Sequence, residues 1–286
     1  MTANLTTEKR LAPTLSAQGG AEIPAIGFGT SSLGGSAAEL VATALRLGYR
    51  HIDTAWKYGT ERGVGEGLRA SEVPREEIFL TTKVSHEYLH AADFARSVDE
   101  SLRNLGVDYV DLLLVHWPEK NTPLAETMAA LARAKRQGLA RHVGVANFNI
   151  AMLDEAMALC PEPLVTLQAE CHPYLDQSKV IEACRRRGLV LTAYCPLARG
   201  RLAGDPVLAD IARRTGKTFA QVALRYLLQH KVIAAIPRSS NAQRIAQNLD
   251  VFDFELSEDD MRRIHALKHA DGRIANPAGR APAWDV

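Results

Sequence analysis

The sequence predicts an α/β fold, and within that class a closed (β/α)8 barrel of the TIM type. Short apolar runs alternate with amphipathic stretches, which gives about eight strand-then-helix units along the chain. No interruption separates a second domain in the 286 residues, and about 250 residues is the usual length of one such barrel. A doubly wound open sheet would share the alternation, but a count near eight favours the barrel.

The individual elements follow from hydrophobic periodicity and from the residues that end helices. The strands are short, continuous and apolar, which is typical of a sheet covered on both faces. A longer segment at 197–218 is assigned no element. The predicted helices are 37–47, 60–69, 91–105, 124–137, 151–159, 178–187, 219–229 and 242–248; after a first apolar segment at 26–29, the predicted strands are 51–53, 78–82, 109–115, 142–146, 165–169, 189–193 and 232–236.

The two ends of the chain lie outside this alternation. Residues 1–15 are polar with scattered charges, and we expect a flexible leader there, leaving 16–286 as a single domain. Within 15–23 a Gly-Gly pair separates two short apolar segments, which predicts a short N-terminal β-hairpin. The C-terminal end predicts a short tail.

Composition excludes several classes of protein. The 34 basic and 33 acidic residues give a net charge of +1, which argues against a dedicated nucleic-acid or membrane-surface protein. No apolar run reaches the roughly 18 residues needed to cross a bilayer, and the start lacks the apolar core of a secretory signal. The cysteines show no metal-ligand spacing, so we expect free thiols, no metal site and a soluble cytoplasmic protein; they are Cys160, Cys171, Cys184 and Cys195.

Polar side chains stand where the predicted strands end. In barrels of this type the chemistry lies at the carboxyl ends of the strands, so these residues are expected to meet at one mouth. Asp53, Lys83 and His116 follow three successive strands and should lie within reach of one another. Tyr58 is close to Asp53 in the chain, and a phenol, with a pKa near about 10, needs a cation to act at neutral pH. The later strand ends carry Asn147, Gln168, Tyr194 and Arg238.

The segments around these residues resemble the aldo-keto reductase family over nearly the whole chain. The resemblance is carried by Asp-Thr-Ala-x-x-Tyr-Gly at 53–59, Thr-Thr-Lys at 81–83, Leu-x-His-Trp-Pro at 114–118, Val-Gly-Val-Ala-Asn-Phe at 143–148 and Ile-Pro-Arg-Ser at 236–239. The end of the chain, Ala-Pro-Ala-Trp-Asp at 281–285, is similar to the bacterial branch with 2,5-diketo-gluconate and methylglyoxal reductases.

The resemblance implies an NADPH-dependent oxidoreductase that reduces small aldehydes and ketones, including diketo sugar acids or methylglyoxal. Tyr58 would be the general acid, and Lys83, kept charged by Asp53, would lower the phenol pKa. His116 would donate a hydrogen bond to the substrate carbonyl oxygen. Because the four act as one unit, the effects of replacing them should be non-additive.

The same resemblance implies an NADP(H) site on the later strands. Tyr194 would stack on the nicotinamide, while Asn147 and Gln168 would bind its carboxamide. Arg201 would clamp the pyrophosphate beside the loop residues Pro196 and Leu197. The last loop and helix would take the 2′-phosphate, with an arginine where the family usually has lysine; this set is Arg238, Ser239, Ser240, Asn241, Arg244, Gln247 and Asn248.

The substrate pocket is expected to be walled by tryptophans, namely Trp56, Trp117 and Trp284 from the tail. His51 and His172 are interpreted as structural. Cys195 replaces a serine common in the family and is interpreted as a small core residue. We expect a monomer whose partner is a small-molecule carbonyl substrate.

Two other functions remain open from the sequence. The barrel could bind NADP(H) and act as a sensor or partner subunit, although an intact set of four residues argues against this. A metal-dependent hydrolase could use His51, Asp53 and His116, but Lys83 and Tyr58 would then have no role. The glycines at 63–67 are not a dinucleotide-binding loop, because their spacing is wrong and no strand precedes them; close helix packing explains them better.

Overall fold

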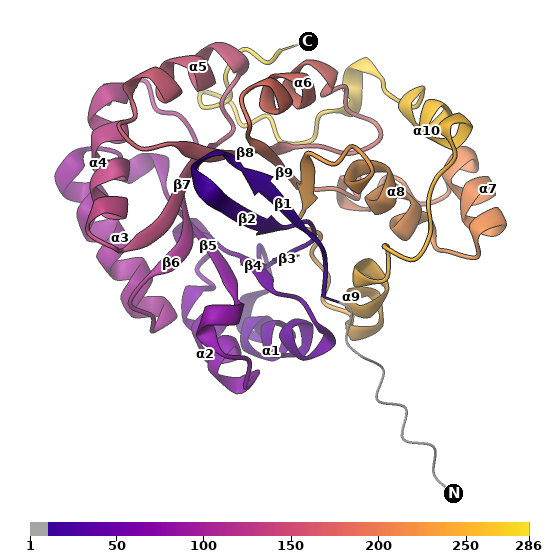
Figure 1. The fold of residues 1–286 in the computed structure, drawn as a ribbon, viewed down its shortest axis with the longest axis horizontal. Helices are drawn as coiled ribbons and strands as arrows, with labels where there is room; N and C mark the ends of the chain where they lie inside the picture. The colour runs from indigo at the N-terminus through magenta and orange to yellow at the C-terminus, as the bar shows by residue number, and fades with distance from the viewer. Residues whose placement is uncertain (1–10, 286) are drawn as a thin grey trace, which may run out of the picture.

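Eight parallel strands form the centre of the computed structural model, which describes residues 11–285 (Figure 1). Their order in the sheet is β10-β9-β8-β7-β6-β5-β4-β3. The sheet closes on itself, because the Gly27 amide donates to Ala235 O at 2.8 Å and the Ala235 amide to Ala25 O at 2.9 Å. The predicted barrel is confirmed. The strands are β3 (Phe28–Gly29), β4 (His51–Asp53), β5 (Phe79–Val84), β6 (Val110–Val115), β7 (Ala140–Ala146), β8 (Leu164–Glu170), β9 (Val190–Tyr194) and β10 (Ile233–Ala235).

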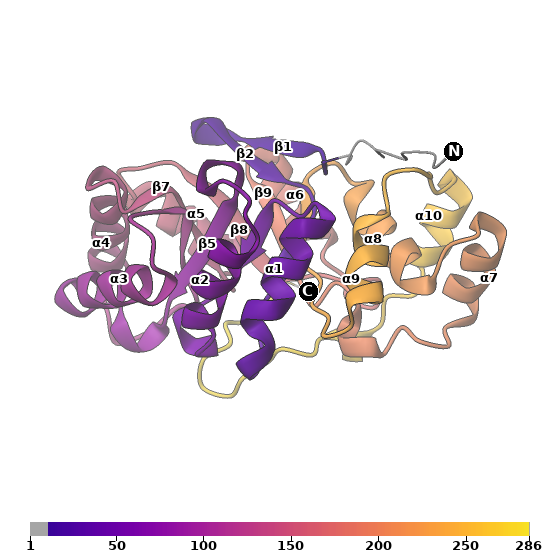
Figure 2. The same ribbon diagram turned by 90° about the horizontal axis from the view of Figure 1, so that it is seen from below.

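Helices surround the sheet, and each strand is followed by at least one of them (Figures 1 and 2). The eight predicted helices are present, with ends within about two residues of those expected. Two further helices, α7 and α10, had not been predicted. The helices are α1 (Ala37–Leu47), α2 (Glu61–Ala70), α3 (Ala91–Leu105), α4 (Leu124–Arg136), α5 (Ile150–Leu159), α6 (Ser178–Arg186), α7 (Pro206–Thr215), α8 (Phe219–Leu228), α9 (Ala242–Leu249) and α10 (Glu258–His265).

The predicted hairpin is present and lies across the amino-terminal end of the barrel (Figure 2). It consists of β1 (Thr14–Ala17) and β2 (Ala21–Pro24). The Gln18 side-chain Nε2 donates to Leu164 O at 2.6 Å, and the Gln18 backbone N–H donates to Gly188 O at 2.7 Å. These bonds hold the turn against the starts of β8 and β9. Ile23 is fully buried against the residues inside the barrel. The hairpin therefore closes this end.

The boundary of the predicted leader needs correction. Residues 1–10 lie outside the described part of the chain. Thr14 and Leu15, which we had placed in the leader, belong to β1, and Pro13 O accepts from the Ala25 amide at 2.8 Å. The polar composition of the segment hid a short strand, because an edge strand buries only one side of its residues.

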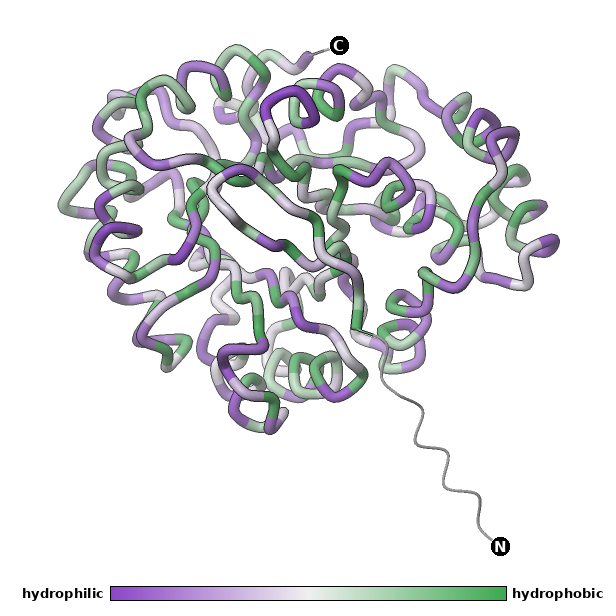
Figure 3. The backbone as a smooth tube through the Cα atoms, viewed as in Figure 1, coloured by the Kyte–Doolittle hydropathy of each residue, from purple (hydrophilic) through white to green (hydrophobic). Residues whose placement is uncertain are grey.

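Burial follows the pattern expected of a barrel. All residues of β6 and β8 are buried, so both faces of these strands are covered, as their continuous apolar sequences predicted. In Figure 3 the strands are largely green, whereas purple segments lie mainly on the surrounding helices. No helix within 11–285 is long and apolar enough to span a membrane.

The glycines at 63–67 serve helix packing, as predicted. A Cβ atom on Gly65 would lie 2.1 Å from Leu105 O, and one on Gly67 would lie 2.6 Å from Ala38 O. Both distances are far below van der Waals contact. Glycine is therefore required where α2 passes α1 and the end of α3.

Candidate active site

The four predicted catalytic side chains come together at the carboxyl ends of neighbouring strands. Asp53 is the last residue of β4, Lys83 lies near the end of β5, and His116 directly follows β6. Tyr58 ends the short 3-10 helix η3 (Trp56–Tyr58), which follows β4. The ring centroids of Tyr58 and His116 are 5.6 Å apart in an edge-on arrangement, and Lys83 Nζ lies 5.1 Å from the Tyr58 ring centroid.

Asp53 is the centre of a buried network. Lys83 Nζ donates to Asp53 Oδ1 at 2.6 Å and to Thr54 O at 2.7 Å. Gln168 Nε2 donates to Asp53 Oδ2 at 2.8 Å. Lys83 is fully buried, and an ammonium in such a place needs a counter-charge. Asp53 thus holds the lysine, as predicted from the sequence, and also positions Gln168.

The electrostatics favour a protonated phenol and a neutral imidazole. Burial, followed by the Asp53 carboxylate, raises the pKa of Tyr58. We had expected Lys83 to lower this pKa, but the net shift is upward, because burial is the largest effect. Burial, followed by the charge of Lys83, holds the pKa of His116 well below its usual value. Burial also lowers the pKa of Lys83, against the opposing effect of Asp53.

Asn147 links this group to the next two strands. It has a positive φ of 64°, a strained conformation for a residue other than glycine. Its side-chain Nδ2 donates to His116 O at 2.9 Å, and its Oδ1 accepts from the Tyr194 hydroxyl at 2.7 Å. Tyr194 ends β9 and is half-buried. The Gln168 side-chain oxygen has no hydrogen-bond partner among residues 11–285, so it is free to accept from an amide such as the nicotinamide carboxamide.

The loop after β9, which includes the predicted pyrophosphate site, carries three residues with strained backbone conformations. Cys195, Ala198 and Arg199 all have positive φ values, of 50°, 49° and 51°. Arg199, which the sequence reasoning missed, interacts with the Cys195 side chain, which raises the pKa of the arginine. Arg201 is exposed and points to no described partner, while Pro196 is buried and Leu197 half-buried. All four cysteines are free, as predicted.

The last strand-helix loop holds two free guanidinium groups. Arg238 and Arg244 are exposed, and neither guanidinium forms a hydrogen bond or ion pair within the described chain. Asn241 begins α9, and its Oδ1 accepts from the Arg244 amide at 3.0 Å. The positive end of the α9 dipole lies in the same loop. The chemistry of this set fits a phosphate group. The other predicted residues here are Ser239, half-buried, Ser240, exposed, Gln247, half-buried, and Asn248, buried.

The three predicted tryptophans surround the mouth from different elements. Trp56 lies edge-on to Tyr88 at 4.9 Å between ring centroids. Trp117 follows His116, and its ring centroid lies 6.3 Å from that of Trp284 in the C-terminal tail. Trp284 therefore reaches the site from nearly the last residue of the chain. The tail also brings Arg273, whose guanidinium carbon lies 3.8 Å from the centroid of the Trp284 ring.

The histidines interpreted as structural are buried in polar contacts. His51 Nε2 lies 3.2 Å from Thr81 Oγ1, and His172 Nε2 lies 2.8 Å from Glu170 Oε1. No group of three or more His, Cys, Asp or Glu side chains in residues 11–285 is placed to hold a metal ion. Both Asp53 oxygens are engaged by other side chains, so this geometry does not favour the hydrolase alternative.

Glu170 is the principal residue that the sequence reasoning missed. It ends β8, is fully buried, and accepts hydrogen bonds from the tail as well as from His172. The sequence did indicate it as a candidate site residue, because Glu170 stands at the end of a predicted strand, as Asp53 does. We had assigned the strand end to Gln168, which lies two residues earlier.

Comparison with known proteins agrees with this site. The model of the aldo/keto reductase family matches residues 25–269. The glyoxal reductase of Bacillus subtilis (strain 168) is 39% identical over 269 residues, covering 93% of this chain and 97% of that protein. Methylglyoxal reductase DkgB of Salmonella typhimurium is 40% identical over 267 residues, covering 92% and 99%.

Solved structures give the same result. A crystal structure described as that of a candidate 2,5-diketo-D-gluconic acid reductase B has a TM-score of 0.94 and 43% identity, covering 97% of this chain and 99% of that one. The Bombyx mori aldo-keto reductase AKR2E4, solved in complex with NADP, has a TM-score of 0.85 and 33% identity, covering 91% and 94%. The chain belongs to the aldo/keto reductase family.

Proposed function

We propose that this enzyme reduces small aldehydes and ketones, among them 2-oxoaldehydes such as methylglyoxal, with Tyr58 as the general acid. The observation that carries the proposal is the contact between a buried Lys83–Asp53 pair, the Tyr58 phenol and the His116 imidazole. Family membership confirms the predicted oxidoreductase class and the predicted family, including its bacterial branch.

Each side chain has a task that its environment supports. NADPH, when bound, supplies the hydride for the carbonyl carbon. Tyr58, kept protonated by its raised pKa, donates the proton to the developing alkoxide. His116, kept neutral, donates an N–H to the carbonyl oxygen and orients it toward the phenol. Lys83 provides positive charge beside the phenol as the proton leaves.

The predicted cofactor, NADP(H), is confirmed by the family, one of whose members was solved with NADP. Within this chain we assign the nicotinamide to Tyr194, Asn147 and Gln168. The loop from Pro196 to Arg201 is assigned to the pyrophosphate. The 2′-phosphate is assigned to the loop with the two free guanidiniums, and this set is Arg238, Ser239, Ser240, Asn241, Arg244, Gln247 and Asn248.

The preference for small carbonyls is drawn from the relatives. The Bacillus and Salmonella proteins are named for glyoxal and methylglyoxal, which are small dicarbonyl compounds. Trp56 and Trp117 would supply an apolar wall for such substrates, and Trp284 would extend this wall for larger ones. We further propose that the enzyme acts as a cytoplasmic monomer with one barrel domain.

Turnover with purified protein tests the proposal. NADPH oxidation should be observed with methylglyoxal and with 4-nitrobenzaldehyde, at the same rate with and without a chelator. Tyr58→Phe should lower kcat by about 10²- to 10⁴-fold, the usual contribution of general acid catalysis, while NADPH binding stays unchanged. An active Tyr58→Phe enzyme would remove the assigned acid. NADPH binding by the wild-type protein without turnover of any carbonyl would favour the sensor alternative.

A further inference from the structure

The C-terminal tail passes over the carboxyl ends of the strands, on the face opposite the hairpin (Figure 2). Between α10 and Asp285 it contains only one short 3-10 helix, η7 (Ala270–Gly272). A Cβ atom on Gly272 would lie 2.0 Å from Tyr174 O, so the tail runs directly against the loop after β8. A segment with so little regular structure must be held by other contacts.

Two groups of hydrogen bonds, here called clasps, hold the tail. The first clasp is formed by Glu170. Its Oε1 accepts from the Ile274 amide at 2.7 Å, and its Oε2 accepts from the Ala275 amide at 2.7 Å. His172 Nε2 provides a third contact at 2.8 Å. Burial alone would raise the pKa of Glu170, but these three hydrogen bonds outweigh it and hold that pKa below its usual value. Hydrogen bonds to an ionised carboxylate are stronger than those between neutral groups, so Glu170 holds this part of the tail firmly.

The second clasp lies at the other end of the tail. Asp285 Oδ2 accepts from the amide of Ile150, the first residue of α5, at 2.9 Å. Asn149 Nδ2 donates to Ala283 O at 2.9 Å. Asp285 therefore binds one of the amides that a helix start leaves without a partner, and its negative charge suits the helix dipole.

Trp284 lies between the clasps and is contacted from several sides. Its Nε1 donates to Asn276 Oδ1 at 3.0 Å, and the Arg273 guanidinium covers one face at 3.8 Å. Its ring lies edge-on to Trp117 at 6.3 Å. Asn276 and Arg273 flank the two residues bound by Glu170, so the first clasp fixes both partners of the indole.

We infer that Glu170 and Asp285 are positioning residues that hold Trp284 against Trp117 and thereby determine which carbonyl substrates fit. Neither carboxylate contacts Tyr58 or His116 by a hydrogen bond or ion pair. They act on substrate binding through the indole, and chemistry at the phenol is unaffected by them. The inference rests on the proposed function, because it places the substrate beside Tyr58 and Trp117.

Steady-state kinetics with a small and a larger flat substrate test the inference. Asp285→Ala and Glu170→Gln should each raise KM for 4-nitrobenzaldehyde about tenfold, the effect of losing part of an apolar wall. For methylglyoxal both KM and kcat should change less than about twofold, because so small a molecule gains little from the indole. In Asp285→Ala the affinity for NADPH should not change. Equal changes in KM for both substrates would overturn the inference.

A double-mutant cycle separates positioning from general damage. Trp284→Ala should reproduce the KM change, and adding Asp285→Ala to it should have almost no further effect. If the KM changes of the two single variants multiply in the double variant, Asp285 does not act through Trp284. Asp111→Asn is a matched control, since Asp111 is also a buried carboxylate that accepts a backbone amide, from Leu80 at 3.0 Å, but at the opposite end of the barrel. Its KM values should stay at the wild-type level.

A readout without turnover keeps the inference separate from the proposed function. Acrylamide quenching of tryptophan fluorescence should increase in Asp285→Ala and in Glu170→Gln, because Trp284 loses its cover. The increase should be absent when Trp284 is alanine. If Glu170→Gln does not fold, Asp285→Ala near the chain end carries both measurements. A wild-type protein that reduces neither substrate refutes the proposed function; unchanged quenching refutes the positioning.

Discussion

At the scale of single residues, Asp53 shows how much of the site depends on one carboxylate. Its two oxygens accept from Lys83 and Gln168, which belong to two different strands. The sequence predicted the lysine contact, because both residues stand at neighbouring strand ends. It did not predict the glutamine contact, since β8 is separated from β4 by three strands in the sheet. Contacts across the interior of a barrel depend on the stagger of its strands, which the sequence pattern does not specify.

The sign of the Tyr58 pKa shift was not predictable for a similar reason. The order of the residues indicates that Lys83 is near the phenol, but not how deeply both are buried. In the folded protein burial is the largest effect on Tyr58, and the lysine is already paired. The Lys83 charge beside the ring is therefore not enough to bring the pKa of the phenol below its usual value.

Arg244 provides a test of cofactor discrimination at the residue scale. Arg244→Ala should weaken NADPH binding by about 10- to 100-fold, the effect of one charge-assisted hydrogen bond, because its guanidinium is free to bind the 2′-phosphate. NADH lacks this phosphate, so its affinity should change less than twofold. Titration of cofactor fluorescence measures both values.

A second arginine is the control for this prediction. Arg201 is also exposed and without a described partner, but it is assigned to the pyrophosphate, which both cofactors share. Arg201→Ala should therefore weaken NADPH and NADH equally. Equal losses in Arg244→Ala would show that the phosphate site lies elsewhere.

At the scale of elements, the strands were predictable because nearly every residue in them is apolar and buried. Helix α10 was not, since only two of its residues are buried, Asp260 and Ile264, and one apolar side chain gives no periodic signal. Helix α7 did carry signals. Asp205 caps its start, a proline follows, and Leu208, Ile211 and Ala212 form a buried face.

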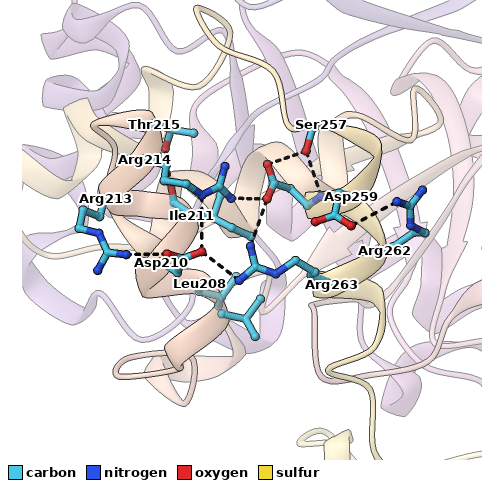
Figure 4. Close-up of polar contacts among 12 residues, drawn as sticks. Leu208, Asp210, Ile211, Arg213, Arg214, Thr215, Ser257, Asp259, Arg262 and Arg263 are labelled. Carbon is cyan, nitrogen blue, oxygen red and sulfur yellow. Dashed lines mark hydrogen bonds and ion pairs between the residues drawn. The ribbon is translucent and has the colours of Figure 1, made fainter.

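The two unpredicted helices are held together by ion pairs (Figure 4). Arg214 of α7 donates to Asp260 of α10, while Arg263 of α10 pairs with Asp210 of α7 at 2.9 Å. Asp260 is buried and also accepts from Ser257 Oγ at 2.8 Å. Charge pairing between the helices thus adds to the apolar contacts that Leu208, Ile211 and Ile264 make in the core.

This network predicts unequal effects for two neighbouring aspartates. Asp260→Asn should lower the free energy of unfolding by about 1–2 kcal/mol, because a buried carboxylate loses charged hydrogen bonds. Asp259→Asn should change it by less than about 0.5 kcal/mol, since Asp259 pairs with Arg262 on the exposed side of the same helix. Urea unfolding measures both. A similar loss in the two variants would show that the interhelical pairs contribute nothing particular, and kcat should be unchanged in each.

At the scale of the whole molecule, both ends of the barrel are covered by segments outside the strand-helix alternation. The hairpin closes one end, and the tail crosses the other (Figure 2). The sequence predicted the hairpin, because a Gly-Gly turn between apolar segments is a local signal. It did not predict how the tail is held, since Glu170 and Ala275 are about a hundred positions apart and their contact is to the backbone.

Histidines of the barrel contribute to how stability depends on pH. Burial lowers the pKa of five of them, to about 4 for His230; the others are His51, which is fully buried, and His86, His116 and His142, which are partly exposed. In the unfolded chain these groups titrate near about 6.5. Below that pH the unfolded state binds protons that the folded state does not, so stability should fall as pH decreases, by up to about 1.4 kcal/mol per pH unit for a buried histidine and by less for the partly exposed ones. Above it, this contribution is constant.

His230→Phe isolates one such proton. His230 packs edge-on against Tyr226 at 5.2 Å between ring centroids, so phenylalanine keeps the ring contact and removes the titrating group. Urea unfolding between pH about 7.5 and about 5.5 should give a slope that is smaller than wild type by up to one proton. Glu61, whose pKa is raised by burial, contributes with the opposite sign in both proteins, so the difference between them is the quantity to compare. Identical slopes would show that His230 is protonated to the same extent in the folded and unfolded states.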